Sequence, residues 1–414
     1  MSTEQVDVVV VGAGIAGSAL ARTLARAGVS VLALERSKEY VDHVRGEYMH
    51  PWGVAETQRL GVHDDLIAAG GSDIVRFVGY DEVVAPEEAD ATAFPLDTLL
   101  PGVPGGMSIG HPTSCRTLEA LAVGAGAEVV HGAEVLDMTF GATPSVTYQV
   151  DSTERRVDCR VVVGADGRES SVRKRLGVEL HRNDPRIFLA GMLVDEVRDW
   201  PDGHSSIGTD GDSMLYVFPQ REGTARLYLG FSIEDKTRLA GRDKARTFLD
   251  SFRVEAIPDN ARVADAVPAG PCAAYPMFDS WTDSPVAEGV VLVGDAAGFS
   301  DPTIGEGLSV ALRDARMVGD IMLEDDDWAP ARFDSYSEER AERMRRLRFC
   351  NQVYTDAHIP LGPDRVAERR RRLQLLNGGD PDLFMSIAAM ACGPEVAPET
   401  SFDPSVRDRL LAPA

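Results

Sequence analysis

The sequence predicts an α/β fold: a Rossmann-like nucleotide-binding domain with an inserted β-rich domain and C-terminal helices. Three observations predict this fold. A glycine-rich turn joins an apolar strand to a helix near the start of the 414-residue chain. Two more apolar strands end in glycine and aspartate, at 161–167 and 290–295. Segments that alternate like β-strands lie between these motifs, and helical patterning dominates after about residue 330.

The first element is a nucleotide-binding βαβ unit. A mostly apolar run, residues 6–11, leads into the spacing Gly12, Gly14 and Gly17. Gly12 permits a tight turn, Gly14 leaves room for a diphosphate to approach the backbone, and Gly17 lets the helix pack closely against the sheet. Glu35 ends the next apolar run, where an acid binds ribose hydroxyls. The spacing predicts an adenine dinucleotide, bound at the positive end of the helix.

The second and third motifs also place an acid at the end of a strand. Asp166 and Gly167 follow the run 161–163, and Asp295 follows the run 290–293. The third motif continues through Gly305-Glu306-Gly307 into a predicted helix. Its aspartate can accept hydrogen bonds from ribityl hydroxyls, and the amides at the helix start favour a ring that becomes anionic when reduced. The third motif therefore suits a flavin.

Bulk properties restrict the class of protein. A hydrophobic content of 44% supports a sizeable core, and the length predicts two domains or one elaborated domain. A net charge of −24 disfavours nucleic acids and anionic membranes as partners. Five scattered cysteines without a C-x-x-C spacing indicate neither a disulfide framework nor a zinc site. With no signal peptide and no membrane span expected, we predict a cytoplasmic protein without stable membrane association.

The motifs divide the chain into a discontinuous nucleotide-binding domain and an inserted domain. Strand-like alternation occurs at 74–80, 187–194, 214–218 and 225–233. Apolar residues keep helical spacing from 308 to 322, before an acidic surface break. The predicted ranges are 1–74, 110–180 and 275–325 for the nucleotide-binding domain, 75–109 and 181–274 for the β-rich substrate domain, and 326–414 for the C-terminal helical region.

Two C-terminal segments allow more than one interpretation. Arg369 to Arg372 could recruit an anionic partner, but the solvated face of a helix is the preferred interpretation. Leu383 to Cys392 is largely apolar and could lie at a dimer interface or cap the active site, although core packing is favoured.

In this order, the three motifs resemble those of the class A FAD-dependent monooxygenases, the aromatic hydroxylases similar to p-hydroxybenzoate hydroxylase. The resemblance extends from residue 6 to about residue 320. It implies FAD as the bound cofactor, places Arg45 near the diphosphate and makes Arg116 face FAD. The predicted cofactor-binding residues are Gly12, Ala13, Gly14, Ile15, Ala16, Gly17, Glu35, Arg36, Arg45, Arg116, Asp166, Gly167, Gly294, Asp295, Pro302, Gly305, Gly307 and Leu308.

The resemblance also implies a reaction. NADPH or NADH reduces FAD, O2 adds to the reduced ring to give a C4a-hydroperoxide, and one oxygen passes to an aromatic or polycyclic small molecule by hydroxylation or epoxidation. We assign no catalytic residue. Candidate substrate residues are Tyr48, His50, His204, Tyr216, Phe218, Tyr228 and Phe231, although aromatic residues on a strand more often pack in a core.

Departures from the family pattern keep other functions open. Gly298, Glu306 and Ser309 stand where the family commonly has histidine, glutamine and asparagine. The Gly-Glu-Gly run also resembles geranylgeranyl reductases, which reduce isoprenoid double bonds. Flavin-dependent halogenases share the scaffold, but their Trp-x-Trp-x-Ile-Pro signature is absent from the sequence. A flavin-binding protein without turnover is a further alternative. No nucleophile elbow or metal-ligand spacing occurs, which disfavours hydrolases and metalloenzymes.

Overall fold

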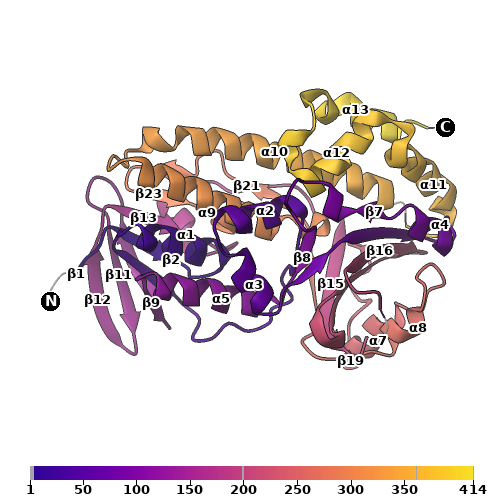
Figure 1. The fold of residues 1–414 in the computed structure, drawn as a ribbon, viewed down its shortest axis with the longest axis horizontal. Helices are drawn as coiled ribbons and strands as arrows, with labels where there is room; N and C mark the ends of the chain where they lie inside the picture. The colour runs from indigo at the N-terminus through magenta and orange to yellow at the C-terminus, as the bar shows by residue number, and fades with distance from the viewer. Residues whose placement is uncertain (1–3, 198–199, 360, 414) are drawn as a thin grey trace.

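A six-stranded, mostly parallel sheet forms the centre of one half of the molecule (Figure 1). The computed structural model describes residues 4–197, 200–359 and 361–413. All strands of this sheet except β22 run parallel. In spatial order the strands are β22 (Val286–Ala287), β23 (Val290–Leu292), β13 (Val161–Gly164), β2 (Val8–Val11), β3 (Val31–Glu35) and β9 (Glu128–His131).

Valine-rich strands form this sheet because both of its faces are covered. Every residue of β2 is buried, as expected for a central parallel strand. One face packs against α1 (Ile15–Arg26), α5 (His111–Gly124) and α9 (Gly307–Glu324). The other face packs against a four-stranded sheet. Its strands are β1 (Glu4–Gln5), β12 (Thr153–Asp158), β11 (Ser145–Val150) and β10 (Glu134–Thr139).

A second large sheet fills the other half of the molecule and is mainly antiparallel (Figure 1). Its strands come from two separate stretches of the chain, on either side of β13. The strands are β6 (Arg76–Asp81), β7 (Phe94–Pro95), β15 (Ile187–Asp195), β16 (His204–Asp210), β17 (Ser213–Pro219), β18 (Ala225–Ser232), β19 (Val267–Pro268) and β20 (Ala273–Pro276). The predicted α/β fold with an inserted sheet and C-terminal helices is confirmed.

Alternation along β17 gives this sheet two different faces. Leu215 and Val217 pack with α7 (Lys244–Asp250) and α8 (Asn260–Ala264) in one core. Tyr216 and Phe218 point to the opposite face, since successive side chains of a strand alternate. This second face turns toward the C-terminal helices.

The C-terminal helices lie above that face (Figure 1). They are α10 (Asp334–His358), α11 (Val366–Gln374), α12 (Pro381–Cys392) and α13 (Pro404–Leu411). The apolar segment 383–392 forms most of α12, and Leu383 and Ala389 pack in the core as predicted. Met390 and Ala391, on the same helix, line a cavity described below. Among the described helices, none is both long and apolar enough to cross a bilayer.

The prediction that Arg369 to Arg372 form a solvated face is wrong for two of the four residues. Arg369 is fully buried and pairs with Asp81 and Glu82 at the end of β6. Arg372 is also buried, and its Nη1 donates to the carbonyl of Asp356. The acids that pair with Arg369 are almost 290 positions away in the sequence, so local composition could not reveal the pairing.

Short elements connect the two halves. A small sheet joins β4 (Tyr48–Met49), β8 (Gly106–Ser108) and β5 (Ser72–Ile74), and β14 (His181–Arg182) pairs with β21 (Ser280–Trp281). The remaining α-helices are α2 (Pro51–Arg59), α3 (His63–Ala68), α4 (Pro86–Ala91) and α6 (Ser171–Leu176). β4 brings the segment after β3 toward the large sheet.

Candidate active site

The three motif turns lie side by side at the carboxyl edge of the parallel sheet. β2, β13 and β23 are adjacent, and Val11, Gly164 and Leu292 are aligned across them. The amide of Ala165 donates to the carbonyl of Val11 at 2.8 Å, so the first two turns are in contact. Crevices at this edge are the usual ligand sites of open α/β sheets.

The three glycines of the first turn have the geometry that their spacing predicts. Gly12 has a φ of +100°, and a Cβ on Gly17 would lie 1.9 Å from the carbonyl oxygen of Gly12. These two positions therefore exclude side chains. A Cβ on Gly14 would meet nothing within 4 Å. Gly14 consequently leaves open space next to the N-terminus of α1, where a diphosphate can approach.

Glu35 closes the first turn from the end of β3. Its Oε2 accepts a hydrogen bond from the amide of Ala13 at 3.0 Å, and its Oε1 accepts one from the amide of Ser37 at 2.8 Å. A carboxylate has further acceptor capacity on each oxygen. The acid therefore fixes the turn and can still accept from a ribose.

The two aspartates have different environments. Asp166 accepts hydrogen bonds from the amides of Ser171 and Val172 and so caps the start of α6, while its other oxygen is buried without a partner among the described residues. Asp295 is partly exposed, and its Oδ2 lies 3.3 Å from Nε of Arg168. Asp166 thus caps α6 through one oxygen, Asp295 is accessible to a ligand, and contact of either with the cofactor stays a prediction.

A buried ion cluster holds the third turn. The amide of Gly294 donates to Asp314 at 2.8 Å, and Asp314 pairs with Arg340 at 2.9 Å and with Arg343 at 2.6 Å. Arg340 also donates to the carbonyls of Gly294, Ala297 and Gly298. Burial alone raises the pKa of Asp314, but the two guanidinium groups outweigh burial and lower it. Helix α10 therefore positions the turn that carries Asp295.

Arg45 lies on a strained loop that leads into a large cavity. Val44 has a φ of +55°, which is unusual for a β-branched residue. Arg226 is fully buried and pairs with Asp42 at 2.7 Å and with Glu47 at 2.8 Å. These two acids precede and follow Val44 in the loop. These ion pairs hold the loop in place. Arg45 itself is exposed and lines the cavity.

Arg45 also lies close enough to His111 to affect the pKa of that histidine. Burial, followed by the charge of Arg45, lowers the pKa of His111 at the start of α5 to about 4. Arg116, on the same helix, is exposed and bonds to the carbonyl of Tyr40 and the hydroxyl of Thr113. The two predicted arginines therefore lie near α5, but only Arg45 lines the cavity.

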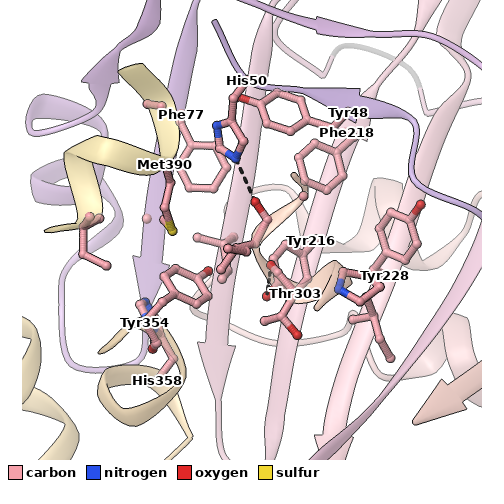
Figure 2. Close-up of a pocket in the computed structure, with 18 of the residues that line it drawn as sticks. Tyr48, His50, Phe77, Tyr216, Phe218, Tyr228, Thr303, Tyr354, His358 and Met390 are labelled. Atoms are coloured by element: carbon pink, nitrogen blue, oxygen red, sulfur yellow. Dashed lines mark hydrogen bonds between the residues drawn. The ribbon is translucent and has the colours of Figure 1, made fainter. Parts of the chain in front are cut away.

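The cavity, of about 1340 Å³, lies between the second face of the large sheet and the C-terminal helices. Of the predicted cofactor residues, it is lined by Arg36, Arg45, Pro302 and Gly305. Of the predicted substrate residues, it is lined by Tyr48, His50, Tyr216, Phe218 and Tyr228 (Figure 2). His204 begins β16 outside the cavity, and Phe231 packs in the core against Phe188. Neither of these two lines the cavity.

Aromatic side chains dominate one wall of the cavity. The rings of Tyr48 and Phe218 stack with centroids 4.9 Å apart, and Tyr216 is stacked 6.1 Å from Phe218. Tyr354, from α10, lies opposite Tyr216 (Figure 2). Burial raises the pKa of Tyr216 well above its ordinary value, so its hydroxyl stays protonated. The cavity offers flat apolar surfaces and a few hydroxyl groups.

A buried carboxyl lies behind this wall. Glu306 is fully buried; its Oε2 accepts from Nε1 of Trp52 at 2.9 Å, and its Oε1 is 3.9 Å from Nε2 of His50. His50 in turn donates to the carbonyl of Ile304 at 2.9 Å (Figure 2). Burial raises the pKa of Glu306 well above its usual range and lowers the pKa of His50 to about 4. His50 is therefore neutral near pH 7, and burial favours the neutral form of Glu306.

This burial predicts an unusual pH dependence of stability. Because the pKa of Glu306 is higher in the folded than in the unfolded protein, the folded state keeps a proton that the unfolded state loses above about pH 4.3. Stability is therefore lost as the pH rises toward the folded pKa, by up to about 1.4 kcal/mol per pH unit. We expect Glu306→Gln, measured by urea unfolding between about pH 5 and about pH 8, to become increasingly more stable than the natural protein. Glu324→Gln, at the exposed end of α9, is the control and should follow the natural protein.

Several site residues were not identified from the sequence. Phe77 lines the cavity from β6, and Tyr354 and His358 line it from α10. Arg226, Arg340 and Arg343 support the loops around it. Tyr354 and His358 are four residues apart, so the sequence alone places them on one face of a helix. Nothing in the sequence indicates which surface that face contacts.

The observed geometry fits FAD. The open space at Gly14, the open space at Gly307 by the start of α9, and accessible Asp295 lie along one edge of the sheet. A long cofactor with a diphosphate, a ribityl chain and a ring needs these three kinds of contact. The fold and the site therefore define an FAD-dependent oxidoreductase.

Comparison with known proteins agrees with this class. Residues 5–348 match the family described as "FAD binding domain". The chain belongs to this family, which is that of the class A flavoprotein monooxygenases, and the resemblance seen in the sequence is confirmed.

Similar proteins include both reductases and hydroxylases. Digeranylgeranylglycerophospholipid reductase 1 of Methanococcoides burtonii is 28% identical over 329 residues, which are 78% of this chain and 75% of the relative. The flavoprotein/dehydrogenase of Cytophaga hutchinsonii has a TM-score of 0.77 at 16% identity and covers 99% of both chains. The anhydrotetracycline hydroxylase OxyS of Streptomyces rimosus has a TM-score of 0.70 at 21% identity, over 94% of this chain and 76% of the hydroxylase. These structures show a shared fold.

Proposed function

We propose that the protein is a monooxygenase that uses FAD, NADPH or NADH, and O2 to hydroxylate or epoxidise an aromatic or polycyclic small molecule. The observation that carries this proposal is the stacked aromatic wall of the cavity, Tyr48, Phe218 and Tyr216, next to the Pro302–Gly305 turn. Flat rings pack favourably against such a wall. When bound, FAD supplies two-electron transfer from the nicotinamide and activation of O2.

The residues of this chain would bind the cofactor and exclude water. Gly12 and Gly17 would shape the first turn, in which Gly14 leaves room for the diphosphate. Glu35 would accept hydrogen bonds from a ribose, and Asp295 would accept them from the ribityl chain. The Pro302–Gly305 turn and the start of α9 would hold the ring. The sheet and α10–α12 enclose the reacting space, which protects a reactive oxygen species from water.

The test of this function is coupled turnover. A panel of polycyclic aromatic compounds should include one that stimulates NADPH or NADH oxidation, with matching O2 uptake and a product carrying one added oxygen. Oxidation that yields only hydrogen peroxide with every compound would contradict the proposal.

A second candidate function is the reduction of an isoprenoid double bond. Saturation of an alkene needs a proton as well as a hydride, and burial favours the protonated form of Glu306. This carboxyl does not line the cavity itself, but it lies 3.9 Å from Nε2 of His50, which does. The relative from Methanococcoides burtonii is named as a reductase. A saturated product formed without O2 would support this candidate, and a strict requirement for O2 would exclude it.

A further inference from the structure

The cavity has a second end, far from the three motif turns. At one end it is lined by Arg36, Arg45 and Arg168, near the carboxyl edge of the parallel sheet. The other end is lined by residues of the segment 83–92, of α11 and α12, and of the turn between these helices. In Figure 1, α4 and α11 lie on the side of the molecule away from the parallel sheet. We call this the distal end, and it comprises Val83, Val84, Glu88, Thr92, Arg370, Gln374, Asn377, Phe384 and Ile387.

Arg370 differs from the other arginines of its run. Arg369 pairs with two carboxylates, Arg371 donates to the carbonyl of Leu410 at 2.7 Å, and Arg372 is buried with carbonyl and carboxylate partners. Arg370 is exposed, lines the cavity, and makes a hydrogen bond of 3.4 Å to the carbonyl of Val83. Within the described ranges, no carboxylate oxygen lies within 4.0 Å of its guanidinium.

The surroundings of Arg370 combine apolar surface with hydrogen-bond donors. Phe384 is 40% exposed, a high value for an aromatic side chain, and lies with Ile387 on the α12 side of the distal end. Gln374 and Asn377 add amide groups. Glu88, on α4, is an acid at this end, and Asp81, which also lines the cavity, is paired with Arg369. A guanidinium beside apolar side chains recognises an acidic group attached to an otherwise apolar molecule.

We propose that the distal end binds the carboxylate of an amphiphilic substrate through Arg370, while the apolar body of the substrate lies along the aromatic wall. The proposal rests on the proposed function, because it assigns the cavity to the substrate. It concerns binding rather than chemistry, so turnover is not needed to test it. With a net charge of −24, the protein as a whole repels anions, and selection of an acidic substrate requires such a local cation.

The experiment uses two probes of the same shape, anthracene-2-carboxylate and anthracene-2-methanol. Equilibrium dialysis against the FAD-loaded protein, without NADPH or NADH, gives the dissociation constant of each probe. The natural protein should bind the carboxylate more tightly. Arg370→Gln should weaken the carboxylate about tenfold, the loss expected for one charge-assisted hydrogen bond, and leave the alcohol unchanged. Glu88→Gln should tighten the carboxylate, because it removes a like charge.

The control is Arg365→Gln, which changes the net charge equally. Arg365 is exposed, pairs with Glu368 and does not line the cavity. Equal affinity of the natural protein for both probes would overturn the proposal. An equal loss of affinity for the carboxylate in the Arg365 and Arg370 variants would also overturn it, because the general charge of the surface would then explain the loss. Loss of turnover with this selectivity intact would contradict only the proposed function.

Discussion

Gly14→Ala is expected to lower the affinity for FAD by about 100-fold without unfolding the protein. In the absence of ligand the new Cβ meets nothing within 4 Å, and the backbone of Gly14 has a φ of −73°, which alanine adopts easily. The Cβ would occupy the space through which a diphosphate approaches the start of α1. Loss of two charge-assisted hydrogen bonds, at about 1.5 kcal/mol each, corresponds to this factor.

The measurement is FAD titration of the apoprotein, followed by the change in flavin absorbance, together with thermal unfolding of each apoprotein. Gly124→Ala is the matched control, because a Cβ there also meets nothing within 4 Å and the residue lies at the far end of α5. Its affinity for FAD and its unfolding temperature should both stay near those of the natural protein. Undiminished affinity of the Gly14 variant would show that the cofactor does not approach the first turn.

The parallel sheet and its turns could be predicted because their determinants are local. The glycine spacing of the first turn requires only that residues within one βαβ unit interact, and Gly12 and Gly17 show the predicted close contacts. The strands of the inserted sheet could also be predicted, because a short, almost continuously apolar segment such as β17 is typical of a strand with both faces covered. Local sequence patterns therefore predict the strands and helices and the cofactor end of the site.

The far wall of the cavity could not be predicted because it depends on pairings between distant residues. Arg369 is buried only because Asp81 and Glu82 lie beside it, and a basic run in isolation is typical of a solvated helix. Tyr354 faces Tyr216 because α10 crosses the large sheet. His204 shares the residue type of His50, but it lies at a strand end outside the cavity. Residue type alone does not distinguish these positions.

Asp314→Asn is expected to destabilise the protein by about 3–5 kcal/mol, the usual cost of leaving a buried charge without its partner. Arg343 would retain Glu339, but Arg340 would keep only carbonyl groups as partners within the described chain. The amide of Gly294 would also lose its carboxylate acceptor. Urea unfolding measures the change in free energy, and FAD titration should show weaker binding because the third turn loses its support.

The control for this substitution lies on the same helix. Asp320→Asn removes an exposed i, i+4 pair with Arg316, for which a loss of only about 0.3–0.5 kcal/mol is expected.

The two variants should also differ in how their stability depends on pH. Since the pKa of Asp314 is lower in the folded protein, the stability it contributes is present above the unfolded pKa of about 3.9 and is lost as the pH falls through the folded value. The Asp314 variant should therefore lose less stability on acidification than the Asp320 variant, and equal losses in both would mean that the buried cluster does not hold the third turn through its charge.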